Sequence, residues 1–194
     1  GNVTVWSDDV TSFAGAISTQ ALGNSGDGGE TEVSGSQLEY LGRTSLLARN
    51  GKTGNLLIDP YNLTISAGSQ TGTSGFTASA TGANINTTTL QNALATANVT
   101  IATGASGAED GDITVADAVS WSANTSLTLK AAGAIKINAA ISNSGAASGL
   151  TLTAAGSGGI YGAGAIANSG ALTLNVIHAA ADGTLSGVIS GSGT

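Results

Sequence analysis

A short unit, in which Thr stands between two apolar residues, returns along this chain and constrains its fold more than any other feature. Its copies are Leu63-Thr64-Ile65, Val99-Thr100-Ile101, Ile113-Thr114-Val115, Leu127-Thr128-Leu129, Leu150-Thr151-Leu152 and Leu172-Thr173-Leu174. The last three copies follow one another at a nearly constant spacing, and their surroundings agree, since residues 127–133 match 150–156. Alternation of apolar and polar residues with a period of two predicts β-strands that each have one buried face.

These repeats are too short and too poor in large side chains to bury a core one by one. The chain has 30 Gly and only 4% aromatic residues, and Gly, Asn, Ser and Asp separate the candidate strands. Stacking successive turns of a coil would bury Leu, Ile and Val in a continuous ladder. We therefore predict an all-β solenoid, a parallel β-helix of about nine coils with roughly 20 to 22 residues each.

The chain divides into three regions within a single β-helix segment over residues 1–194. Residues 1–66 have the pattern of looser coils, and residues 99–194 that of regular coils. Between them, residues 67–83 form a run rich in Gly, Ser, Thr and Ala, which predicts a projecting loop. Residues 88–97 carry Leu90, Ala93, Leu94 and Ala97 at helical spacing. This spacing predicts a short amphipathic helix that covers one edge of the rod.

The charge balance excludes several classes of partner. The chain has five Lys and Arg against 12 Asp and Glu, for a net charge of -7, and its bases are scattered. Nucleic-acid binding and attachment to an anionic membrane both need clustered cations, so we expect neither. No apolar run approaches the roughly 20 residues of a membrane-spanning helix, so we expect no membrane insertion. The absence of Cys removes disulfides, thiolate metal sites and thiol catalysis.

An ordered series of segments resembles the filamentous-haemagglutinin-like exoproteins. These segments are residues 1–8, 28–35 and 50–60, and residues 89–94, 98–101, 111–115 and 120–121 are similar to the high-molecular-weight adhesin branch. The resemblance implies a right-handed parallel β-helix in a large secreted adhesin, displayed on the surface of a Gram-negative bacterium by two-partner secretion. It also implies an outer-membrane secretion partner and a glycan or protein receptor on host cells or other bacteria.

The chain opens within the pattern and lacks the Asn-Pro-Asn type of motif found in the secretion domain of such exoproteins. We therefore expect an internal piece of a longer exoprotein, either its shaft or a binding region.

Two acidic clusters are the candidate metal sites. One is Glu109-Asp110-Gly111-Asp112 with Asp117 nearby, and the other is Asp8-Asp9. Carboxylate oxygens suit Ca²⁺, but neither cluster matches a twelve-residue calcium loop or a Gly-rich calcium repeat. Solvated turns explain both clusters better, and we predict no metal and no other cofactor.

Few residues suggest catalysis. Asp59, with Lys52, Arg49 and Arg43, forms the only mixed-charge neighbourhood in the sequence, and we expect the Asp59 carboxylate to bond local backbone amides. His178 is the only His and adjoins Ile177 in a strand-like segment, which favours packing. A β-helix lyase or hydrolase needs paired carboxylates in one groove, so we predict no enzyme activity.

Aromatic residues are the candidate ligand-stacking side chains. They are Trp6, Trp121, Tyr40, Tyr61 and Tyr161, and core packing is an equal explanation for each. Thr71, Thr73, Thr151 and Thr153 do not recur in the register that an ice-binding face needs, which argues against that function.

Five Asn-x-Ser/Thr sequons occur, at Asn2, Asn62, Asn86, Asn98 and Asn124. Most would arise by chance in a chain so rich in Ser and Thr, and the family resemblance implies glycosylation at such sites.

Taken together, the sequence predicts a non-catalytic segment of a secreted surface adhesin that extends the molecule and mediates attachment. A passive stalk without a ligand and a carbohydrate-active β-helix enzyme are the two alternatives. A binder would carry a clustered aromatic site or a projecting loop, most plausibly residues 67–83.

Overall fold

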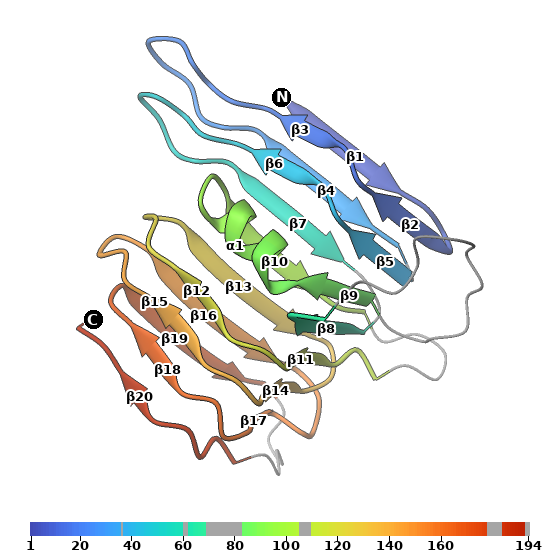
Figure 1. Ribbon diagram of the computed structural model, residues 1–194, viewed down its shortest axis with the longest axis vertical. Coiled ribbons are helices and arrows are strands. Elements are labelled where there is room, and N and C mark those ends of the chain that lie inside the picture. Colours follow the sequence, from blue (N-terminus) through green and yellow to red (C-terminus); the bar gives the residue numbers. More distant parts are fainter. Residues whose placement is uncertain (36, 60–61, 69–82, 105–109, 178–183, 193–194) are drawn as a thin grey trace.

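The computed structural model describes residues 1–35, 37–59, 62–68, 83–104, 110–177 and 184–192. The described strands pair in parallel and stack as a β-solenoid of about six turns, with one short helix, so the predicted parallel β-helix is confirmed (Figure 1). The predicted projecting loop lies almost wholly outside the described residues. Only its two ends are described, and Ala83 is already the first residue of a strand.

The first sheet runs the whole length of the rod and holds seven parallel strands. In spatial order they are β1 (Asn2–Trp6), β4 (Glu30–Ser34), β7 (Asn55–Asp59), β10 (Asn98–Ala102), β13 (Ser126–Ala131), β16 (Gly149–Ala154) and β19 (Ala171–Val176).

The second sheet forms a second face of the rod. In spatial order its strands are β17 (Ile160–Tyr161), β14 (Ile135–Ile137), β11 (Ile113–Val115), β8 (Leu63–Ser66), β9 (Ala83–Asn86), β5 (Gln37–Tyr40) and β2 (Val10–Phe13).

The third face is divided by the helix α1 (Thr87–Leu94). Toward the N-terminal end of the rod, this face holds the strands β3 (Ala16–Ser18) and β6 (Arg43–Ser45). Toward the C-terminal end, it holds β12 (Val119–Trp121), β15 (Ile141–Asn143), β18 (Ile166–Asn168) and β20 (Ile189–Ser190).

The sequence repeats lie in register, but the coils differ in length. Leu127 pairs with Leu150 and Leu150 with Leu172 along the first sheet, so the matching copies stack directly. The coil between the paired residues Leu56 and Val99 is far longer than either of these two. The predicted number of about nine coils is wrong, because only the last two coils are near the length on which that number was based.

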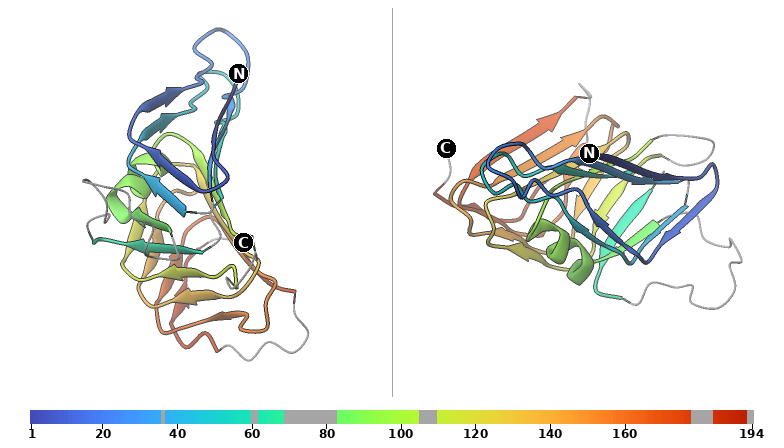
Figure 2. Two further views of the ribbon diagram at one scale, coloured as in Figure 1. Left: turned by 90° about the vertical axis from the view of Figure 1, so that its right-hand side faces the viewer. Right: turned by 90° about the horizontal axis from the view of Figure 1, so that it is seen from above.

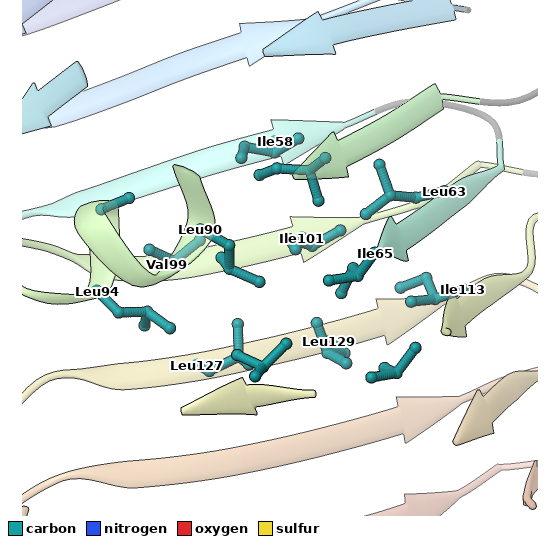
Figure 3. Close-up of a cluster of buried hydrophobic side chains, with 14 of the residues drawn as sticks. Ile58, Leu63, Ile65, Leu90, Leu94, Val99, Ile101, Ile113, Leu127 and Leu129 are labelled. Atoms are coloured by element: carbon teal, nitrogen blue, oxygen red, sulfur yellow. The ribbon is translucent and has the colours of Figure 1, made fainter. Parts of the chain in front are cut away.

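The core is built from columns of inward side chains, one from each coil. The first sheet alone supplies the continuous column Val33, Ile58, Ile101, Leu129 and Leu152, each of which is fully buried. Figure 3 shows the middle of this column, at Ile58, Ile101 and Leu129. Burying one such side chain contributes about 1.5 to 3 kcal/mol. Each side chain depends on the coils above and below it for its burial.

The helix α1 takes the place of a third-face strand in the widest coil. Asn86 caps its N-terminus by accepting a hydrogen bond from the Thr88 N–H at 2.8 Å, and Leu90, Ala93 and Leu94 are buried. Ala97, just beyond its end, is buried as well, so the predicted helix and its apolar face are confirmed. Among the described residues, no helix is long and apolar enough to cross a membrane.

Side-chain bonds fix this helix between β6 and β12. The Thr96 hydroxyl donates to the Thr44 carbonyl at 2.7 Å on one side, and the Ser120 N–H donates to Gln91 Oε1 at 2.9 Å on the other. A helix is about 10 Å wide, which equals roughly two strand spacings.

An additional strand widens the second sheet at the same level. The first sheet passes from β4 to β10 through β7 alone, whereas the second sheet passes from β5 to β11 through both β9 and β8. The second and third faces are therefore longer there than the first sheet. Figure 2 shows the rod curving at this level, with α1 on the outer side of the curve.

Close contact between coils makes Gly54 a test of the stacking. A Cβ at Gly54 would lie 2.1 Å from the Gly29 carbonyl oxygen, whereas a Cβ at Gly23 would lie 3.8 Å from its nearest neighbour. We expect Gly54→Ala to lower the free energy of unfolding, measured in urea, by about 1 to 3 kcal/mol, because the backbones of two neighbouring coils must move apart to admit the methyl group. Gly23→Ala is the matched control and should change it little. Equal losses of unfolding free energy in Gly54→Ala and Gly23→Ala would contradict this close packing of the coils.

Candidate functional site

A groove runs along the corner between the first and second sheets in the C-terminal half of the rod. Its volume is about 570 Å³, a size common for ligand sites. The lining residues come from turns of successive coils and from β17, and they are Asp110, Asp112, Ala132, Gly133, Ala134, Gly156, Ser157, Gly158, Tyr161 and Thr184.

Stacked glycine turns form the floor of this groove. The Gly133 N–H donates to the Gly111 carbonyl at 2.9 Å, and the Gly156 N–H donates to the Gly133 carbonyl at 2.8 Å. Gly111 has a φ of 76°, which an L side chain rarely adopts. A Cβ at Gly133 would lie only 2.2 Å from Asp112 Oδ1. Glycine at these places therefore lets the turns of neighbouring coils stack closely.

Acidic side chains stand at one end of the groove. Asp112 Oδ1 accepts the Ala134 N–H at 2.7 Å, and the Asp112 N–H donates to Asn62 Oδ1 at 2.7 Å, so this residue is held between two coils. Asp110 is exposed on the same turn. The carboxylates are hydrogen-bond acceptors, and the exposed Ser157 and Thr184 add hydroxyl groups that can both donate and accept.

Tyr161 gives the groove an aromatic wall. It is a half-buried residue on β17, where it pairs with the exposed Lys136 of β14. The other aromatic candidates are placed differently. Tyr40 and Trp121 are buried, Trp6 is 63% exposed on the edge strand β1, and Tyr61 lies outside the described residues. Of the aromatic candidates that the structure describes, Tyr161 is thus the one that lines this groove.

A second groove, of about 500 Å³, crosses the third face over β12, β15 and β18. Its polar groups bond one another. Asn143 Nδ2 donates to Asn168 Oδ1 at 2.9 Å, and the Asn168 amide donates to the Gly170 carbonyl at 2.6 Å. The Trp121 indole N–H donates to the Thr125 carbonyl at 3.0 Å. These side chains hold coils together, and the corner groove is the better candidate site.

Two members of the acidic clusters make hydrogen bonds within the fold. Asp117 Oδ2 accepts the Ala67 N–H at 2.8 Å, and the Asp9 N–H donates to the Ser7 hydroxyl at 3.2 Å. Within the described part of the chain, no three His, Asp or Glu side chains are grouped closely enough to hold a metal ion. Glu109 and His178 lie outside the described residues, and the absence of a metal stays a prediction.

The threonines of the sequence repeat form a column along the first sheet. Thr100, Thr128, Thr151 and Thr173 pair in register on the outer side of the first sheet. The next outward column holds Ala102, Lys130, Thr153 and Asn175, so two adjacent threonine columns do not form.

Amide groups of the sequons have roles in the fold. The side-chain amide of Asn98 donates to the Thr53 carbonyl at 3.1 Å, and that of Asn86 donates to the Gly68 carbonyl at 3.3 Å. Asn62 and Asn124 accept backbone N–H groups of neighbouring coils. Asn2 is exposed at the end of the stack.

Compared with protein-family models, curated proteins and solved structures, the chain has no match.

Asp59 lies in a different charge environment from the one predicted. Its carboxylate is influenced by Glu32 and Lys130 of first-sheet strands, and not by the basic residues nearest in the sequence. Burial raises the pKa of Asp59, the negative charge of Glu32 raises it further, and Lys130 lowers it. The nearest charges in sequence are therefore not the ones that act on this carboxylate.

This raised pKa predicts how stability depends on pH. The folded chain holds the Asp59 proton more tightly than the unfolded chain, so the contribution of Asp59 is complete in acid and is lost as pH rises through the unfolded and then the folded pKa. Asp59→Asn stays neutral and should raise the melting temperature at pH 7, with a gain that disappears below about pH 4. Exposed Asp9→Asn is the control. A lower melting temperature for Asp59→Asn than for the wild type at pH 7 would contradict the raised pKa of Asp59.

Proposed function

We propose that this chain is a non-catalytic segment of a secreted bacterial surface adhesin, which extends the molecule and contributes to attachment. The resemblance of its ordered segments to filamentous-haemagglutinin-like exoproteins supports this proposal, as does the rod built of stacked coils. The single observation that carries the binding role is the corner groove, which Tyr161 lines together with the hydrogen-bond acceptors Asp110 and Asp112.

The chemistry of this groove suits a saccharide. A sugar ring has an apolar face that packs on an aromatic ring, and hydroxyl groups that donate to carboxylates. Tyr161 offers the ring, and Asp110 and Asp112 offer the acceptors. Because the groove carries acids and the chain has a net charge of -7, we expect neutral sugars to bind better than sialylated or sulfated ones.

A carbohydrate-active enzyme is the second candidate, and the two carboxylates in one groove favour it. Glycoside hydrolysis places carboxyl groups on both sides of the scissile bond. Asp110 and Asp112 stand close together on one turn, and Asp112 already accepts a backbone N–H, which suits binding better than catalysis. Release of reducing ends from a glycan panel, lost in Asp110→Asn, would favour the enzyme.

Binding to an array of neutral and anionic glycans tests the proposed function. We expect saturable binding of a neutral glycan, weakened about tenfold or more in Tyr161→Ala and retained in Tyr161→Phe, because the ring makes the contact. Trp6→Ala removes an exposed aromatic side chain outside the groove, and Thr114→Ala changes an outward residue of β11; both are controls.

Circular dichroism and the melting temperature must match the wild type for each variant. Absence of binding by folded wild-type protein would leave the passive stalk. Equal losses in Tyr161→Ala and Trp6→Ala would place the ligand elsewhere.

A further inference from the structure

Two neighbouring turns extend beyond the strand ends in the N-terminal half of the rod. Residues 19–29 join β3 to β4, residues 46–54 join β6 to β7, and the two turns run side by side (Figure 1). The Arg49 N–H of the second turn donates to the Ala21 carbonyl of the first at 2.9 Å. The Lys52 N–H donates to Asp27 Oδ1 at 2.8 Å. Hydrogen bonds between coils therefore hold the second turn on both sides of its tip.

The tip of the second turn carries Asn50 and Gly51, the single Asn-Gly pair of the sequence. Both residues are exposed, and the Asn50 side-chain amide donates a long hydrogen bond, of 3.4 Å, to the Gly23 carbonyl. An Asn side chain cyclises most readily when Gly follows it, because Gly has no Cβ beside the backbone nitrogen that attacks. The turn thus presents a reactive pair to solvent.

The stacking of the two turns requires glycine at position 51. A Cβ on Gly51 would lie 2.2 Å from the Gly26 carbonyl oxygen and 2.6 Å from Asp27 Oδ1. A residue with a side chain would shield the backbone nitrogen, but it would also force the neighbouring turn to move away. The packing between coils therefore demands the residue that leaves this nitrogen unshielded.

We propose that Asn50 is a site of spontaneous deamidation, at which the chain is modified without an enzyme. The Gly51 backbone nitrogen attacks the side-chain carbonyl carbon of Asn50, and the new carbon–nitrogen bond closes a five-membered succinimide ring. The bond from this carbon to the amide nitrogen breaks, and ammonia leaves with the proton that the Gly51 nitrogen gives up. Water then opens the ring at either of its carbonyls, which yields aspartate or isoaspartate.

Burial protects two Asn residues that also precede a small residue. Asn143 and Asn168 are each followed by Ser, but both are buried in the third face. Asn143 Nδ2 donates to Asn168 Oδ1 at 2.9 Å, and Asn143 Oδ1 accepts the Gly145 N–H at 2.9 Å. Cyclisation would break these buried hydrogen bonds, so we expect both residues to stay intact in the folded chain.

Two exposed Asn residues differ from Asn50 in the residue that follows. Asn124 precedes Thr125, whose branched side chain crowds the backbone nitrogen. Asn24, in the first turn, precedes Ser25, which carries a Cβ without branching. We therefore expect Asn50 to deamidate first, Asn24 more slowly and Asn124 most slowly of the three.

The isoaspartate product disturbs the contact between the two turns. Its backbone is one methylene longer, in a turn where a Cβ at Gly51 has no space. The nitrogen that donates to the Gly23 carbonyl leaves as ammonia, and the carboxylate that remains cannot donate. Deamidation also adds one negative charge to a chain whose net charge is already -7. We therefore expect the modified protein to be less stable.

Mass spectrometry of peptides from folded protein, sampled over time in buffer, tests this site. We expect the peptide that contains Asn50 to gain one mass unit first, and faster at mildly alkaline than at neutral pH, because the deprotonated backbone nitrogen attacks. The Asn124 and Asn143 peptides should stay unchanged over the same period. Asn50→Gln requires a less favourable six-membered ring and should remove the first mass gain.

The same measurement in guanidinium chloride separates the effect of the fold from that of the sequence. Asn143 should now deamidate as well, because unfolding exposes it and breaks its hydrogen bonds. An Asn50 that stays intact in the folded protein but deamidates in guanidinium chloride would overturn the proposal. Equal rates for Asn50 and Asn124 in the folded protein would overturn it too.

Melting temperatures test the effect on the coil contact. Asn50→Asp carries the added charge on an ordinary backbone, so it is the matched control for the purified isoaspartate form. We expect the isoaspartate form to melt below both the wild type and Asn50→Asp. An isoaspartate form as stable as the wild type would contradict the contact between these turns as the place where deamidation acts.

Discussion

Each coil of this protein can bury its apolar side chains only against the coils beside it, and the rest of the structure depends on that constraint. A coil holds too few large residues for a core of its own, so the free energy of burial is gained only when copies stack in register. Parallel hydrogen bonding fixes the register, and the column that contains Ile58, Ile101 and Leu129 follows from it. The same constraint demands turns without side chains where coils approach closely.

The departures from regular stacking are where the molecule gains its particular shape. The coil that contains β8, β9 and α1 is the longest, and it lengthens two faces while the first sheet adds a single strand. The rod curves as a result. The corner groove lies elsewhere, over turns of successive coils between the first and second sheets, with Tyr161 on the strand that follows the last of these turns.

The sequence was sufficient for the fold class and for the helix, because both leave local patterns. Thr128 and Thr151 stand at equivalent places in a visible repeat, and Leu90 to Ala97 have helical spacing. It was not sufficient for the number of coils or for the groove. Those depend on which residues lie beside one another across coils of unequal length.

Tyr161 illustrates the difference. Tyr161 is one of five aromatic candidates in the sequence. Asp112 lies much earlier in the chain, in an acidic cluster that is a candidate metal site. No local pattern connects them, and only the stacking of β11, β14 and β17 brings them to one groove. Asp59 was paired with the basic residues nearest in sequence for the same reason, whereas other strands of its sheet supply Glu32 and Lys130.

Distances along the threonine column test the stacking most directly. The chain contains no Cys, so pairs of introduced Cys residues can carry spin labels without interference. The pairs Thr100/Thr151 and Thr128/Thr173 each span two strand spacings, about 10 Å, and Thr100/Thr173 spans three, about 14 Å. Measured by dipolar broadening in dilute protein, the first two pairs should give equal distances and the third a longer one. Unequal distances for the first two pairs would contradict a parallel, in-register solenoid.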